Sequence, residues 1–119
     1  MSITSVINLI KKDLFKKKNE NIFYYFLYSS MLNYAISLEL ASAINLEKQL
    51  TFEQICKIIP KKFGCRSSVK SALDKGVVDG FFIKEINAED KRAKIYKLSQ
   101  NYSLMITEWH LSQKEYYTN

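Results

Sequence analysis

The 119-residue sequence predicts a mainly α-helical fold that contains one small β-hairpin. Three observations support this class. The chain has only 3 Gly and 1 Pro, too few for a loop-rich β-sandwich or a disordered chain. Apolar residues recur at spacings of three and four over most of the chain, and two short alternating stretches lie close together between residues 81 and 98. At this length we expect one domain whose single core needs neither metal nor disulfide.

Two helices are predicted at the start of the chain. The first covers residues 3–17, where apolar residues follow helical spacing with lysines between them. We expect the polar run KKKNEN, at residues 16–21, to end it. The second helix, at about residues 21–46, is apolar around most of its circumference. Such a helix needs more cover than one small domain offers, which favours burial against a second copy of the chain.

The uncharged stretch from Asn21 to Leu38 superficially resembles a signal peptide or a short membrane span, because it follows three lysines. Four polar residues interrupt this stretch: Ser29, Ser30, Asn33 and Ser37. Cleavage would also remove a helix that the rest of the chain needs. We therefore expect a buried helix, a cytoplasmic protein and no membrane partner.

Residues 51–79 predict a pair of helices joined by a glycine turn. Thr51 begins the first, because the motif TFEQ is a capping box in which threonine and glutamine satisfy each other's free backbone amides. Pro60 and Gly64 end that helix. The second helix follows the turn, with apolar residues spaced by three and four, and closes near Gly80.

A hairpin and a last helix complete the chain. The stretches FFIKEI and KIYKLS alternate as strands on either side of a polar connection, which predicts a hairpin over residues 81–98. Ser99 caps a final helix at residues 100–117. Four apolar residues of this helix are expected to pack beside the first helices: Leu104, Met105, Trp109 and Leu111.

Helix, capped helix, glycine turn, second helix and basic hairpin, in this order, predict a winged helix-turn-helix with additional N- and C-terminal helices for dimerisation. This fold places the second helix of the pair in the major groove of DNA. The expected organisation is a single domain over residues 1–119, with N-terminal helices at 1–46, the helix-turn-helix at 51–79, the wing hairpin at 81–98 and the C-terminal helix at 100–117.

Positive charge is concentrated in the middle of the chain. The net charge is +6, and residues 48–80 carry seven basic against three acidic side chains, while residues 81–97 carry five against three. This distribution favours an anionic partner, and with the predicted fold that partner is double-stranded DNA.

The second helix of the pair has an outward face of hydroxyl and basic residues. Small hydroxyls permit close approach to DNA, and Arg and Lys supply contacts to bases and phosphates. The candidate DNA-binding residues on this helix are Arg66, Ser67, Ser68, Lys70, Ser71 and Lys75. The alternative is an ordinary solvated face, which would more often carry Glu and Lys pairs at four-residue spacing.

The hairpin loop adds a second set of candidates. An Arg at the tip of a wing gains from the strong negative potential of a minor groove, and Asp90 is placed to hold Arg92 there through a bidentate pair. Lys91 and Lys94 would reach flanking phosphates. The alternative is a solvated turn with an incidental ion pair.

The segment DKRAKIYKLS resembles the wing of MarR-type winged-helix regulators, in which an Asp-x-Arg pattern precedes the third strand and a Leu-Ser or Leu-Thr pair begins the next helix. RSSVKSALDKGVVDGFF is similar to their recognition helix, glycine and second strand. The resemblance covers about residues 31–99. It implies Asp90 and Arg92 as the wing pair, and a homodimeric transcriptional regulator built from its terminal segments, here residues 1–46 and 100–117.

Catalysis and cofactor binding are not indicated. His110 has no Cys, Asp or Ser arranged beside it for nucleophilic chemistry, and no Gly-rich phosphate loop is present. Cys56 and Cys65 lack metal-ligand spacing, so we expect no metal and no cofactor. Cys56 is expected to be a small core residue, and nothing near Cys65 in the sequence indicates a lowered thiol pKa.

A second function class stays open: a winged-helix module that binds another protein and not DNA. The aromatic segment at residues 22–28 and the two tyrosines Tyr116 and Tyr117 favour it. The operator, the direction of regulation and any small-molecule effector are not specified by the sequence.

Overall fold

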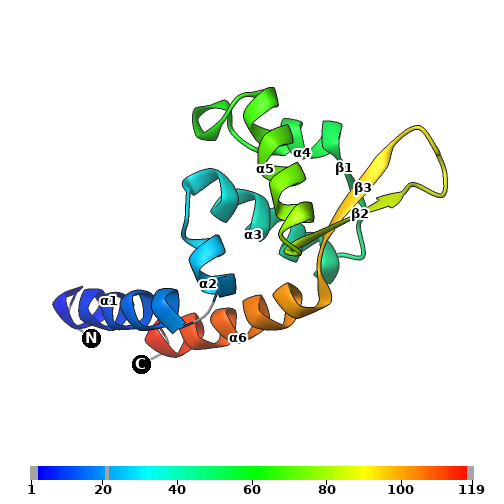
Figure 1. Cartoon of the computed structure of the whole chain (residues 1–119). Helices are drawn as coiled ribbons and strands as arrows, with labels where there is room; N and C mark the ends of the chain where they lie inside the picture. The colour runs from blue at the N-terminus through cyan, green and yellow to red at the C-terminus, as the bar shows by residue number, and fades with distance from the viewer. Residues whose placement is uncertain (1–2, 21, 118–119) are drawn as a thin grey trace.

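The computed structural model describes the backbone of residues 3–20 and 22–117, and the side chains of residues 3–12, 22–23 and 25–111. In chain order, the described elements are α1 (Ile3–Glu20), α2 (Ile22–Leu27), α3 (Met31–Asn45), β1 (Leu50–Thr51), α4 (Phe52–Ile58), the short 3-10 helix η1 (Lys61–Phe63), α5 (Arg66–Val78), β2 (Phe82–Ile86), β3 (Lys94–Leu98) and α6 (Gln100–Tyr117) (Figure 1).

The N-terminal helices differ from the prediction in two ways. The lysine run does not end the first helix, because α1 continues to Glu20. The predicted single helix at residues 21–46 is divided into α2 and α3 by Ser29 and Ser30. Ser30 caps α3 by accepting a hydrogen bond from the Asn33 amide, and the Ser29 hydroxyl donates to the Phe26 carbonyl at 2.7 Å. The two hydroxyls satisfy backbone groups that a continuous helix would satisfy itself, and so they favour a break.

The predicted helix pair is confirmed in place and in its capping. The Thr51 hydroxyl accepts from the Gln54 amide at 3.3 Å, and the Gln54 side chain accepts from the Thr51 amide at 2.8 Å. Pro60 precedes η1, and α5 then begins at Arg66. Gly80 follows α5 with a φ of 87°, a conformation that glycine adopts without strain.

The hairpin is part of a three-stranded antiparallel sheet of order β1-β3-β2. The long pairing is the predicted one, with Phe82 opposite Leu98. The sequence did not predict β1, whose Leu50 pairs with Tyr96 of β3. A two-residue strand is too short to show alternation. It ties the start of α4 to the hairpin, so that the helix pair and the wing form one body.

The core joins both helices of the pair to α3 and the sheet. Ile36 and Leu40 of α3 are fully buried, as is Leu73 of α5. Phe26 of α2 stacks on Phe81 with ring centroids 4.0 Å apart, so the aromatic segment that favoured a protein-binding module is partly core. In the centre of the core, the Ser37 and Tyr102 hydroxyls are 2.8 Å apart and satisfy each other.

Helix α6 presents only part of its apolar surface to this core. Met105 and Trp109 are buried, as predicted, and the Trp109 indole donates to the Tyr28 hydroxyl. Leu104 and Leu111 are 62% and 55% exposed, which contradicts their predicted packing against the first helices of the same chain. They lie seven residues apart, two turns along one face of the helix, and that face is turned to solvent.

Figure 1 shows α1 at one end of the molecule, where it meets the C-terminal part of α6, while α4, α5 and the hairpin lie at the other end. Helix α1 and the C-terminal part of α6 are therefore separate in space from the predicted DNA-binding elements, whereas the first turn of α6 follows directly after β3. Within the described residues, no helix has the length and the apolar character needed to cross a bilayer.

Candidate nucleic-acid interface

Helix α5 turns its polar residues outward because its apolar residues anchor it to the core. Val69, Leu73 and Gly76 are buried against α3 and β2. Six of the ten candidate DNA-binding residues lie on this helix outside the buried set: Arg66, Ser67, Ser68, Lys70, Ser71 and Lys75. Five of these are exposed and Lys70 is half-buried, so the predicted orientation of the helix is confirmed.

Arg66, the first residue of α5, is held by two residues of α4. Its Nη1 donates to Oε2 of Glu53 at 2.7 Å, and its Nη2 donates to Oε1 of the same carboxylate. The guanidinium carbon lies 4.7 Å from the centre of the Phe52 ring. The hydrogen bonds from Arg66 lower the pKa of Glu53, which keeps this carboxylate ionised. Sequence reasoning missed Phe52 and Glu53, because no local spacing signals a pair that joins two helices.

The two lysines of α5 each pair with an aspartate four residues further along the chain. Lys70 donates to Asp74 at 3.2 Å and to the Tyr96 hydroxyl at 3.4 Å, and Lys75 lies 3.2 Å from Asp79. These are pairs at four-residue spacing, the arrangement of an ordinary solvated helix. The alternative interpretation therefore describes the C-terminal half of α5, whereas the first turn has Arg66 and two serines and no such pair within the helix.

Cys65 immediately precedes α5, and its environment corrects the expectation of an ordinary thiol. Its Sγ lies 3.1 Å from the Ser67 hydroxyl and 3.4 Å from the Ser68 hydroxyl, and the residue is exposed. Hydrogen bonds from Ser67 and Ser68 stabilise the thiolate and lower the pKa of Cys65 to about 6. Cys56, by contrast, is half-buried, and burial raises its pKa.

We expect alkylation of Cys65 by iodoacetamide to follow a titration with its midpoint near pH 6. The thiolate is the nucleophile, so the rate rises as pH increases through the pKa and is nearly level by about pH 7.5. Peptide mass spectrometry separates this cysteine from Cys56, which should react slowly over the same range. Ser67→Ala should raise the midpoint. A wild-type midpoint at the ordinary thiol value of about 8.5 would contradict the assignment.

The wing loop differs in detail from its predicted geometry. Asp90 Oδ1 accepts from the backbone amide of Arg92 at 3.0 Å and lies 3.5 Å from its Nε, so the predicted bidentate pair is not formed. Asp90 shapes the turn through the backbone. The Arg92 side chain is 94% exposed, and Lys91 is exposed beside it. The guanidinium is therefore open to a partner.

A groove of about 540 Å³ lies between α5 and the hairpin. Four basic residues line it, Lys70 from α5 and Lys84, Arg92 and Lys94 from the hairpin and its loop, together with the two carboxylates of Glu53 on α4 and Asp90 in the loop. The structure thus brings together four of the ten candidates from two separate parts of the sequence: Lys70, Asp90, Arg92 and Lys94. The other six candidates do not line this groove: Arg66, Ser67, Ser68, Ser71, Lys75 and Lys91.

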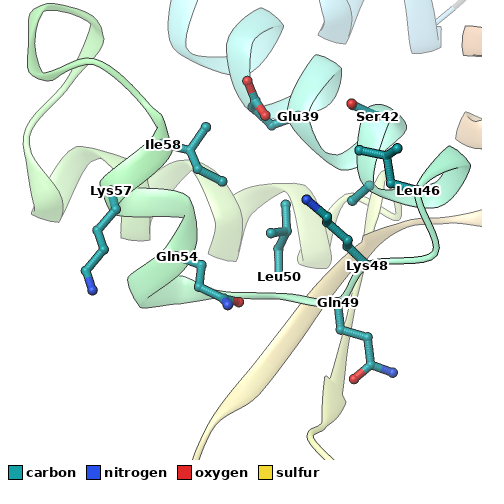
Figure 2. Close-up of a pocket in the computed structure, with 10 residues that line it drawn as sticks. Glu39, Ser42, Leu46, Lys48, Gln49, Leu50, Gln54, Lys57 and Ile58 are labelled. Carbon is teal, nitrogen blue, oxygen red and sulfur yellow. The ribbon is translucent and has the colours of Figure 1, made fainter.

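A second cavity, of about 520 Å³, lies between α3 and α4 (Figure 2). Leu50 points into it from below, Glu39 and Ser42 border it from α3, and the Lys48 ammonium reaches over Leu50. Lys57 points away from the cavity. Its single carboxylate and its ammonium group are both on flexible side chains, so the lining does not select one class of ligand.

Among the described residues, no three His, Cys, Asp or Glu side chains are grouped so that they could hold a metal ion. His110 is exposed on α6. Tyr116 and Tyr117, which favoured the protein-binding alternative, lie outside the residues whose side chains are described.

The described fold is that of the MarR-type winged-helix regulators, which confirms the predicted fold class. Neither a family model nor a curated protein matches the sequence. Among solved structures, the chain is similar to the heme sensor protein PefR in complex with heme and carbon monoxide, with 14% identity and a TM-score of 0.63 over 94% of this chain and 71% of that one.

Two further structures resemble the chain to a similar degree. Wild-type MarR from E. coli is 16% identical with a TM-score of 0.52, over 94% of this chain and 76% of that one. BpsR from Bordetella bronchiseptica, whose DNA binding is regulated by 6-hydroxynicotinic acid, is 11% identical with a TM-score of 0.53, over 98% and 79%. At these identities the likeness shows the fold, and these structural neighbours are regulators and not enzymes.

Proposed function

We propose that this chain is a dimeric transcriptional regulator that binds double-stranded DNA in a sequence-specific way. Helix α5 enters the major groove, and the β2–β3 wing lies at the adjacent minor groove. The observation that carries the proposal is that basic side chains from two elements line the same groove. Lys70 lies on the helix, and Arg92 and Lys94 lie on the wing. The likeness in fold to DNA-binding regulators supports the same conclusion.

The ten candidate residues have distinct roles in this proposal. The first turn of α5, with Arg66, Ser67 and Ser68, contacts base edges, because the N-terminal part of a recognition helix lies deepest in the groove. The remaining basic and hydroxyl side chains contact phosphates, and Asp90 shapes the wing turn. These remaining residues are Lys70, Ser71, Lys75, Lys91, Arg92 and Lys94.

The dimer in this proposal forms through α1 and α6. Both helices carry large apolar side chains that their own chain leaves exposed: Ile3 and Ile7 on α1, and Leu104 and Leu111 on α6. A twofold axis through this end of the molecule turns two copies of α5 toward two half-sites of a near-palindromic operator. A module that binds other proteins through this face is the alternative, and a stable monomer in solution would favour it.

Selection of bound fragments from random duplex DNA tests the proposal, followed by titration of the enriched duplex at two salt concentrations. We expect a near-palindromic consensus and an affinity that falls steeply with salt, with a log–log slope of about −0.9 for each phosphate contact. Arg92→Ala should reduce the slope by about 2, one contact per subunit. Lys48→Ala, at a cation outside the interface, should leave it unchanged. Absence of salt-dependent binding to any duplex would end the proposal.

A further inference from the structure

We propose that Glu53 of α4 is a specificity-determining residue that positions Arg66 to read a guanine in each half-site. This inference rests on the proposed function and names the base that the first turn of α5 recognises. It follows from the contacts that join α4 to α5 across the helix-turn-helix.

One edge of the Arg66 guanidinium is hydrogen-bonded to Glu53, and another edge remains available to a ligand. Nη1 and Nη2 both donate to the Glu53 carboxylate, which occupies the end of the fork. The edge formed by Nε–H and the second hydrogen of Nη2 is not part of this pair. Two parallel N–H donors on one planar edge match the O6 and N7 acceptors of guanine in the major groove, and no other base offers two acceptors there.

Phe52 holds the same group from its face. The guanidinium carbon is 4.7 Å from the centre of the ring, and the Lys70 ammonium is 5.8 Å from it. With its end held by Glu53 and its face covered by Phe52, Arg66 loses little rotamer freedom when it meets a base. The side chains of Arg66 and Glu53 are still 61% and 60% exposed, so the open edge is accessible.

Glu53 also acts against wrong sequences. It lies beside the first turn of the recognition helix and its side chain is 60% exposed, so in the proposed complex its negative charge lies close to the DNA backbone. This charge weakens binding to any duplex that lacks a guanine positioned to accept hydrogen bonds from the open edge of Arg66. Glu53 therefore lowers non-specific affinity and raises specific affinity at once, a combination that a merely structural ion pair would not produce.

The test compares wild type with Glu53→Gln on three duplexes: the selected operator, the same operator with 7-deazaguanine at each guanine in turn, and an unrelated sequence. In wild type, one guanine per half-site should lose about tenfold or more in affinity when N7 is removed. In E53Q this loss should shrink to less than about threefold, and affinity for the unrelated duplex should rise. Arg66→Lys, which keeps the charge but not the fork, should also lose the discrimination.

Asp79→Asn is the matched control. It adds the same unit of net charge and breaks a comparable exposed pair, that of Lys75 at the far end of α5. Thermal unfolding should show both variants folded, and D79N should keep the wild-type discrimination. If wild type discriminates and E53Q does so equally well, the inference is overturned while the proposed function stands. If wild type binds no duplex, both are overturned.

Discussion

Replacement of Gly76 by alanine is expected to destabilise the protein by about 2 kcal/mol, although alanine is the better helix former. A Cβ at this position would lie 2.2 Å and 2.5 Å from two ring carbons of Phe82. Phe82 is 2% exposed and is enclosed by Phe26 and Tyr102, so its ring has no free space to move into. Overpacking typically costs about 1–3 kcal/mol of folding free energy, and contacts this short belong at or above the upper end of that range. The better helix propensity of alanine offsets about 1 kcal/mol of this cost.

Urea unfolding of G76A measures this loss as a lower midpoint. Ser71→Ala, at an exposed position of the same helix, is the control and should leave stability unchanged or slightly raised. If the ring contact is the cause, Phe82→Leu should partly rescue G76A, with a coupling energy of about 1–2 kcal/mol between the two sites. A midpoint for G76A equal to that of wild type would show that α5 and β2 are packed less closely than the structure indicates.

The close contact at Gly76 also affects how α5 and the wing are placed relative to each other in the candidate DNA-binding surface. Its carbonyl accepts from the Phe81 amide at 2.8 Å, directly before β2 begins. Any shift of α5 away from Phe82 therefore changes the angle between the recognition helix and the wing, which together line the basic groove. Close approach of helix and sheet at one glycine thus fixes both candidate surfaces relative to each other.

Features that depend on neighbouring residues could be predicted from the sequence. The capping box at Thr51 is a local hydrogen-bond motif, and the structure forms it as expected. The outward face of α5 follows from helical spacing of its buried residues, of which Leu73 is an example. The hairpin follows from alternation on both sides of a charged loop.

Features that depend on contacts across the fold could not be predicted. The Glu53–Arg66 pair joins two helices, and the residue spacing within either helix does not predict it. The lowered pKa of Cys65 needs the side chains of two serines to turn toward one sulfur. Helix α6 carries apolar residues on two faces, and the sequence does not say which face covers the core; Leu104 and Leu111 were assigned to the wrong one.

Those two leucines lead to the prediction with the largest effect on function. Replacement of Leu104 by aspartate should dissociate the proposed dimer, because a twofold interface buries the new charge twice. A monomer contacts only one half-site, so operator affinity should fall by about 100-fold or more. In the dimer, binding of one subunit holds the other at a high effective concentration near the second half-site. Leu104 is 62% exposed and makes no essential contribution to its own chain's core, so the fold should persist.

Size-exclusion chromatography with light scattering should give wild type at twice the chain mass of 13.9 kDa and L104D at the single mass. Ile86→Asp is the control, because it places the same charge at an aliphatic side chain that is 62% exposed at the loop end of β2. It should leave the mass at the dimer value. An L104D protein that remains dimeric would place the interface away from this face of α6, whereas a monomeric wild type would favour the protein-binding module over the two-half-site regulator.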